Sequence, residues 1–281
     1  MVSAPECSDR VDVVVITALL EERQEMKACF GIPFESQIRS GIPYSFGSID
    51  RGDRSIRIAA VQPVEAGPIP AAVLATRAIL DWRPAAIIMT GICAGVEGLT
   101  RQGDLVVASQ VFDHMAGTYR NGRLIPFQQS VSQEQWLLQI INHLREDKSS
   151  LVDLWRSHPR PDGLIGNLDI HIGAMASGSF VVKDPRYIQS LLEKTSKLFA
   201  LDMEAYGVAC AAKMCSTAFA NANWLVVKGV VDFADANKND DWHGYAGFTS
   251  AKFVHQLLHY ALEREQAYQW ILSRRLTTTR L

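Results

Sequence analysis

The sequence predicts an α/β fold, a three-layer α/β/α sandwich around a mixed, mainly parallel central sheet. Short runs of aliphatic residues, such as Val11–Ile16 and Trp224–Val231, have the length and composition of buried strands. Segments with apolar residues at helical spacing lie between such runs, and Pro68–Trp82 is a clear example, with proline near its start. Strands that alternate with helices in this way form a sheet covered on both faces.

The first half of the chain supplies most of the predicted sheet. A helix is expected over Leu19–Phe30, ending near Gly31. Tyr44–Ile49 alternates as a half-exposed strand does, and Ser55–Val61 is expected to be its neighbour. The remaining elements predicted here are the helix Pro68–Trp82, the strands Ala85–Thr90 and Asp104–Gln110, and the amphipathic helix Glu134–Leu144.

The second half begins with the polar stretch Arg145–Leu164, which contains two prolines and is interpreted as a surface insertion. The elements expected after it are the short apolar segments Ile170–Ala176 and Phe180–Val182, then helices over Arg186–Thr195, Glu204–Met214 and Thr249 to about Ile271. No linker divides two cores. We therefore expect one domain over residues 11–272, a flexible leader at 1–10 and a loose tail at 273–281.

Composition excludes several classes of partner and site. With 281 residues and a net charge of −2, the chain lacks the basic surface that nucleic-acid binding needs. Five cysteines without a CxxC pair argue against a disulfide framework or a zinc site. No apolar run has the length of a membrane span, and the first residues lack a signal-peptide core. The sequence thus predicts a cytoplasmic protein with no nucleic-acid or membrane partner.

Acidic residues occur where predicted strands end. Asp232 ends the buried run Trp224–Val231, and Glu204 follows another apolar run. Ligands of open α/β sheets bind at the carboxyl ends of strands, so an acid there is a candidate proton donor. An aspartate that caps the next element explains the same position equally well. Two more strand ends carry polar or small residues, at Thr17–Glu22 (TALLEE) and Thr90–Gly95 (TGICAG).

Five motifs, each weak alone, follow one another along the chain: TALLEE, TGICAG, SGSFVV, LDMEAYG and VVDFAD. As an ordered set they resemble the nucleoside phosphorylase and nucleosidase superfamily, which includes methylthioadenosine/S-adenosylhomocysteine nucleosidases. The resemblance runs from about Val11 to Leu258. It implies the sandwich fold, cleavage of the N-glycosidic bond of a purine nucleoside or nucleotide, and a homo-oligomer.

The resemblance also implies roles for individual residues. Glu22 matches the glutamate that activates the attacking water, and Asp232 matches the acid that protonates the purine at N7. Met203 and Glu204 match the pair that holds the ribose. Further substrate-binding candidates are Phe180, Val181 and Val182 beside the base, Gly91, Ile92 and Cys93 in the glycine turn, and His114 near the sugar's 5′ end across a subunit contact. A histidine that merely ends a strand is the alternative for His114.

The chemistry of these groups is coherent. Protonation of the base improves a poor leaving group, and carboxylates near the sugar stabilise its developing positive charge. A second carboxylate takes a proton from water on the opposite face, as in inverting glycosidases. Three carboxylates and a water therefore suffice, and we expect no metal ion and no organic cofactor.

Water and phosphate are the two candidate nucleophiles. Phosphorylases of the superfamily hold phosphate with arginines, typically one in the first βα loop and one ahead of the glycine turn. Here the first loop carries Glu21 and Glu22, although Arg23 follows, and Met89-Thr90 precedes the glycine turn. Carboxylates at a phosphate position repel the anion. Hydrolysis is the favoured prediction, and a purine nucleoside phosphorylase is an alternative.

The substrate is harder to predict. The string Asp232–Ala246, which follows D-F-A-D-x-x-K-N-x-x-W-x-x-Y-A, resembles phosphorylase-like effectors of bacterial anti-phage systems and fungal immune proteins. That resemblance implies cleavage of ATP or a related nucleotide to adenine and ribose phosphate, in antiviral defence. The triphosphate of ATP needs cationic partners. The candidates are Lys228, Lys238, Arg120, Arg123 and Lys183. Packing of Trp242 and Tyr245 on the core explains the string equally well.

Three other functions stay open. They are a methylthioadenosine/S-adenosylhomocysteine nucleosidase of salvage, a phosphorylase of the same fold, and a non-catalytic nucleotide-sensing module. The sensing module requires the loss of an essential carboxylate, but Glu22, Glu204 and Asp232 are all present. Besides its small-molecule substrate and further copies of itself, the chain is expected to have a separately encoded sensor or activator.

Overall fold

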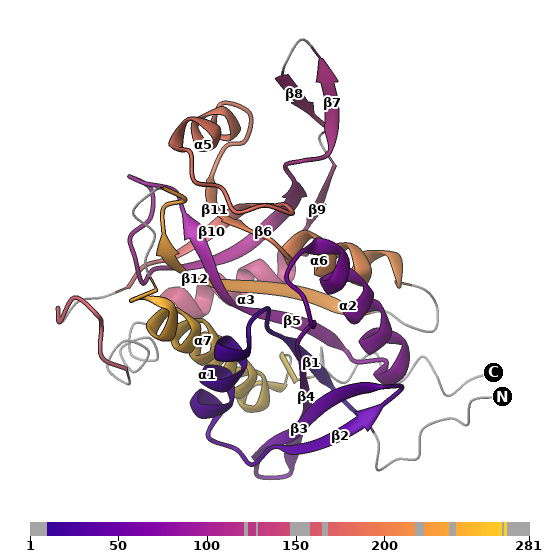
Figure 1. Cartoon of the computed structure of the whole chain (residues 1–281). Coiled ribbons are helices and arrows are strands. Elements are labelled where there is room, and N and C mark those ends of the chain that lie inside the picture. The colour runs from indigo at the N-terminus through magenta and orange to yellow at the C-terminus, as the bar shows by residue number, and fades with distance from the viewer. Residues whose placement is uncertain are drawn as a thin grey trace.

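The computed structural model describes residues 10–120, 123–127, 129–146, 158–164, 168–216, 222–235, 240–265 and 267–268. A mixed central sheet with helices on both faces confirms the predicted fold class (Figure 1). Its described strands, in spatial order, are β11 (Leu198–Asp202), β10 (Ile170–Ser177), β6 (Leu105–Asp113), β12 (Asn223–Asp232), β5 (Ala86–Gly95), β1 (Val13–Ile16), β4 (Arg54–Val61), β3 (Ile42–Arg51) and β2 (Glu35–Arg39), while β9 (Ser130–Ser132) pairs with β6.

The sheet closes partly on itself at β5. Along most of its length β5 pairs in parallel with β1 and β12, because all three are apolar and buried on both faces. Its last residues, Ala94 and Gly95, instead pair antiparallel with Leu201 and Ala200 of β11. This closure brings the ends of β5, β11 and β12 to one place, although β11 and β12 lie apart in the strand order.

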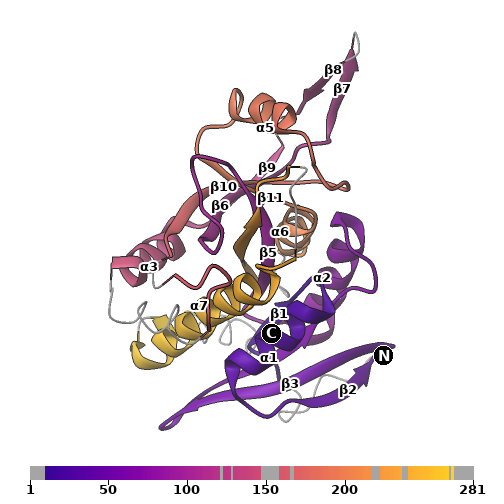
Figure 2. The same cartoon turned by 60° about the vertical axis from the view of Figure 1, so that its left-hand side comes forward.

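Helices cover the two faces of the sheet as separate layers (Figure 2). One layer contains α1 (Leu20–Phe30), α3 (Gln135–Glu146) and α7 (His243–Glu263), whose apolar residues share one core cluster with the sheet. The opposite layer contains α2 (Pro68–Trp82) and α6 (Ala205–Met214). These helices approach closely at Gly207, where an added Cβ would lie 2.1 Å from the carbonyl oxygen of Pro68.

Two further elements lie at the β10–β11 side of the molecule. The helix α5 (Pro185–Leu192) begins at Asp184, whose side chain accepts a hydrogen bond from Arg186 N, and packs its apolar face with β10 and β11. The hairpin of β7 (Gly117–Arg120) and β8 (Arg123–Pro126) projects away from the body in both views (Figures 1 and 2). Neither hairpin strand was expected from the sequence.

The sequence prediction misplaced both ends of the last helix. It was expected over Thr249 to about Ile271, but α7 runs from His243 to Glu263, with an additional turn at its start. Trp242 and Tyr245 are 7% and 2% exposed and form an apolar cluster with Val231 and Ala246, which anchors this additional turn. The segment Phe180–Val182 forms no strand. The leader at 1–9, the tail at 273–281 and most of the predicted insertion lie outside the described residues.

Candidate active site

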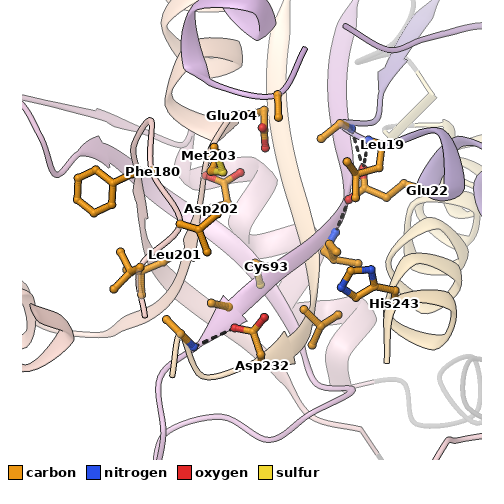
Figure 3. A pocket seen from close by; sticks show the side chains of 18 of the residues that line it. Leu19, Glu22, Cys93, Phe180, Leu201, Asp202, Met203, Glu204, Asp232 and His243 are labelled. Atoms are coloured by element: carbon orange, nitrogen blue, oxygen red, sulfur yellow. Dashed lines mark hydrogen bonds between the residues drawn. The ribbon is translucent and has the colours of Figure 1, made fainter. Parts of the chain in front are cut away.

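A cavity of about 220 Å³ opens where β5, β11 and β12 converge. The start of α1, the segment after β10 and the single residues Ala66, His114 and His243 complete its wall, so stretches distant in sequence contribute side chains (Figure 3). This is the carboxyl edge of the parallel strands, where α/β sheets bind ligands. Ten of the candidate residues line it: Glu22, Ile92, Cys93, His114, Phe180, Val181, Val182, Met203, Glu204 and Asp232.

Backbone hydrogen bonds hold Glu22 at the start of α1. Its Oε2 accepts from Ala18 N at 2.6 Å and from Leu19 N at 3.0 Å, and its Oε1 accepts from Ile92 N at 2.8 Å. Gly91 makes this possible: its φ of +148° suits glycine, and an added Cβ would lie 2.2 Å from Glu22 Oε1. The glycine turn expected after Thr90 is wrong, because β5 continues to Gly95. This part of β5 fixes the orientation of the Glu22 carboxylate and brings backbone to the cavity.

Asp232 ends β12 at the cavity floor and is 5% exposed. The register between β12 and β5 shifts just before it, and Ala234 beyond it has a φ of +53°, so the chain turns sharply here. Asp232 Oδ1 accepts a hydrogen bond from Ala234 N at 2.9 Å. The aspartate thus caps its own turn and not the next helix, since α7 begins at His243. Its carboxyl group also lines the cavity.

Glu204 lies at the start of α6 and is 5% exposed. Its Oε1 accepts from Gly67 N at 2.8 Å, which ties β11–α6 to the loop before α2. Burial raises the pKa of Glu204 to about 7; Lys228 and the Gly67 N–H counteract this effect, and Asp202 and Glu22 add to it. Near neutrality this carboxylate is therefore poised between its two protonation states.

Replacement of Glu204 by glutamine tests this pKa through stability. Because the folded-state pKa lies above the unfolded value of 4.5, the contribution of Glu204 is most favourable below pH 4.5 and is lost as pH rises towards 7. The free energy of unfolding of the unmodified chain, minus that of Glu204→Gln, should therefore fall by on the order of 1–3 kcal/mol between these pH values. Urea titrations at intervals across the range measure it. A difference that rises with pH would contradict the raised pKa.

Lys228 lies beneath the cavity, 1% exposed, with its Nζ 3.6 Å from Asp202 Oδ2. Burial opposes its charge, but Glu22, Asp202 and Glu204 outweigh that effect and raise the pKa of Lys228. A permanent cation thus lies under three carboxylates. The same surroundings leave Cys93 inert: burial raises the pKa of its thiol more than Lys228 lowers it.

The charge of Lys228 should be essential to folding. Lys228→Met keeps the length of the side chain but leaves the buried carboxylates without their cation, which typically costs about 3–5 kcal/mol. We expect a much lower midpoint of urea unfolding, whereas exposed Lys213→Met should leave the midpoint nearly unchanged. Equal midpoints for the two variants would contradict the role assigned to Lys228.

Aromatic and apolar side chains form the wall opposite Glu22 (Figure 3). Phe180 and Val181 are 42% and 52% exposed at the rim. Behind them, His114 is 1% exposed and shares a 2.7 Å hydrogen bond between its Nδ1 and the Tyr187 hydroxyl. Burial lowers the pKa of His114, against the opposite effects of Asp113 and Asp202, so the ring is neutral at pH 7. The wall offers flat apolar contact to a ligand ring.

Comparison with known proteins agrees with this geometry. The family model described as "Phosphorylase superfamily" matches residues 12–263. The chain belongs to the phosphorylase superfamily. It is 29% identical over 272 residues to the uncharacterized protein y4jS of Sinorhizobium fredii, covering 92% of this chain and 62% of that one. It is 24% identical over 253 residues to the ATP nucleosidase Cap17 of Escherichia coli, covering 85% and 49%. The chain therefore spans about half to three-fifths of the length of these relatives.

A solved structure supports the superfamily fold. The methylthioadenosine/S-adenosylhomocysteine nucleosidase of Neisseria meningitidis, in complex with methylthio-immucillin-A, matches with a TM-score of 0.69. The identity is 17%, and the match covers 89% of this chain and 99% of that one. At this identity the likeness concerns the fold alone.

Three of the candidate cations do not line the cavity. Lys228 is buried, Lys183 is exposed, and Arg120 lies on the projecting β7–β8 hairpin, whose second strand begins at Arg123. Lys238 lies outside the described residues. Within the part of the chain that the structure describes, no lysine or arginine lines the cavity, and no group of histidine, cysteine and acidic residues could hold a metal ion.

No described helix has the length and apolar character of a membrane span.

Sequence reasoning missed two polar residues of the lining, Asp202 and His243. Asp202 caps α6 by accepting from Ala205 N and pairs with Lys228. Its place directly before Met203 at a strand end was an available signal. His243 gave no such signal, because the helix that carries it was expected to begin later in the sequence. Glu21, the neighbour of Glu22, has a 75% exposed side chain and faces away from this cavity, as its helical position predicted.

Proposed function

We propose that this chain hydrolyses the N-glycosidic bond of an adenine nucleoside or nucleotide. The observation that carries the proposal is the meeting of Glu22, Glu204 and Asp232 at one cavity with an apolar wall at Phe180 and Val181. A purine ring fits between such a wall and an acid at the floor, and a ribose fits against Met203 and Glu204. This division of the cavity agrees with the roles that the superfamily resemblance implies.

The proposed reaction moves two protons. Asp232 donates its proton to N7 of the base, the C1′–N9 bond breaks, and its electron pair stays with the departing base. Glu204 and Asp202 stabilise the oxocarbenium-like sugar by their negative charge. Water held by Glu22 attacks C1′ and gives up its proton to Glu22. The products are the free base and a sugar with a new hydroxyl at C1′.

Water is the proposed nucleophile because the cavity suits an anion poorly. Four carboxylates, those of Glu22, Asp202, Glu204 and Asp232, line it, and no described lysine or arginine does. Phosphate would meet these carboxylates and no lining cation, since the charge of Lys228 is already opposed by Glu22, Asp202 and Glu204. A phosphorylase therefore has less support, and a non-catalytic sensing module has less still, since the full carboxylate set lines one cavity.

For the substrate, we favour ATP or a related nucleotide, cleaved as a defence effector. The support is the likeness to the ATP nucleosidase Cap17 over 85% of this chain, and the string Asp232–Ala246. This substrate requires cations from outside the described lining. The second candidate, a methylthioadenosine nucleosidase, is favoured by one observation: Leu19, Ala66 and Met203 give the lining near Glu204 an uncharged surface.

We also propose a cytoplasmic homo-oligomer, which a separately encoded sensor or activator controls. The exposed side chains of Ile69, Val73 and Leu80 recur along α2 at helical spacing and support contact between copies. Sedimentation of the purified chain tests this assembly: a monomer at all concentrations would contradict it.

Chromatography of released base tests both the activity and the substrate. The chain is incubated separately with ATP, AMP, adenosine and methylthioadenosine, each with and without phosphate. Adenine from ATP without phosphate would support the favoured function, and adenine from methylthioadenosine alone would support the second. Adenine only in the presence of phosphate would identify a phosphorylase. No base from any substrate would contradict the proposal for this chain on its own.

A further inference from the structure

His243 lies between the active cavity and a second cavity of about 200 Å³. Four residues line both: Leu19, Glu22, Ile92 and His243. The second cavity continues from them to Glu21, Glu25 and Gly244. Figure 3 shows the His243 ring beside this boundary, near Glu22. One imidazole thus faces the candidate general base on one side and a separate passage on the other.

Charged groups surround the ring on its outer side. His243 Nε2 is buried and lies 3.3 Å from Asp240 Oδ1, with no hydrogen bond to a described residue, while Nδ1 lies 4.0 Å from Glu21 Oε2. The side chains of Asp240 and Glu21 are 83% and 75% exposed. The carboxylates nearest to both ring nitrogens are therefore in contact with solvent. Glu22 and Glu25 of α1 add further negative charge to the lining of the second cavity.

The proposed reaction leaves two groups in the wrong protonation state. Glu22 ends a turnover with the proton taken from water, and Asp232 ends it ionised after protonating the base. Hydrolysis releases no net proton, so the enzyme is ready again only when Glu22 has lost one proton and Asp232 has gained one. Backbone N–H groups surround the Glu22 carboxylate, and these donate hydrogen bonds but accept no proton.

We propose that His243 returns the proton of Glu22 to solvent between turnovers. The inference rests on the proposed hydrolysis. Imidazole takes up and gives up a proton near neutral pH more readily than any other side chain. A cavity of this size with polar walls accommodates water, which carries the proton from Glu22 to the ring. The ring then passes it to Asp240, Glu21 or bulk solvent. His243 is thus a positioning and relay residue, and it takes no part in breaking the C1′–N9 bond.

The test compares the first turnover with later ones in His243→Gln and His243→Asn. The probe is ATP or methylthioadenosine, whichever the unmodified chain cleaves. With enzyme in excess, adenine release should keep its normal rate. With substrate in excess, about one adenine per site should appear rapidly, followed by a steady rate lower by on the order of 10²-fold. Added imidazole should restore the steady rate. His259→Gln, on the same helix but away from both cavities, should behave as the unmodified chain does.

Two results would overturn the inference. Equal loss in the first and later turnovers would place His243 in the chemistry or in the shape of the site, and unchanged steady rates in both variants would leave it without a role. These results are distinct from failure of the proposed function, in which the unmodified chain itself releases no base.

Discussion

Asp232→Asn should abolish base release while leaving the fold intact. Asparagine Oδ1 accepts the hydrogen bond from Ala234 N that aspartate accepts in the structure, so the turn after β12 is kept. The amide has no acidic proton to give to the departing base. Loss of general-acid help corresponds to roughly 10²–10⁴ in rate. The rate of adenine release, measured beside the thermal midpoint, separates loss of chemistry from loss of structure.

Asp169→Asn provides the matched control for this variant. Asp169 is an exposed partner of Arg101 just before β10, and it does not line the cavity. Its substitution should change neither the rate nor the thermal midpoint by more than a small amount. Retention of normal turnover by Asp232→Asn would show that another group protonates the base, and the assignment of the general acid would be wrong.

Glu22→Gln should combine a large loss of rate with a smaller loss of stability. The carboxylate accepts three backbone N–H groups on its two oxygens. An amide replaces one of those oxygens by NH₂, so at least one of the backbone N–H groups faces this NH₂ and loses its acceptor. An unsatisfied buried group costs about 1–3 kcal/mol. The rate should fall by at least on the order of 10², since water loses its base, while equilibrium dialysis should still detect bound substrate.

The exposed residue Glu193, at the end of α5, gives a matched control. Glu193→Gln should leave rate, binding and stability unchanged. If Glu22→Gln lost substrate binding together with turnover, Glu22 would be a structural anchor of β5 at Gly91, and the water would need another base. Unchanged turnover would exclude Glu22 from the reaction altogether.

Much of the site could be predicted because its residues lie at the ends of elements with strong sequence patterns. The buried strand that ends at Asp232 and the helix that begins before Glu22 both follow from local periodicity. Parallel strands then place their carboxyl ends together. That rule covers Asp232 and Glu22, whereas Glu204 follows β11, which pairs antiparallel with β5.

What could not be predicted depends on non-local pairing. The antiparallel contact of Ala94–Gly95 with Ala200–Leu201 closes the sheet and sets which residues share the cavity, yet neither segment shows it in its sequence. Lys228 was a candidate for the substrate's phosphate side because a triphosphate needs cationic partners. The structure buries it, since three neighbouring carboxylates offset the cost. The helical turn that carries His243 depends on packing of Trp242 and Tyr245, which periodicity alone did not reveal.

Proton NMR of the reaction in phosphate-free buffer tests hydrolysis at this site most directly. The substrate is the one from which the chain releases base. If water attacks from the Glu22 side, opposite the base, signals of free adenine should grow together with those of the α-anomer of the sugar, before the anomers equilibrate. Adenine that appears only after phosphate is added, together with sugar 1-phosphate, would contradict the account, as would a β-anomer as first product.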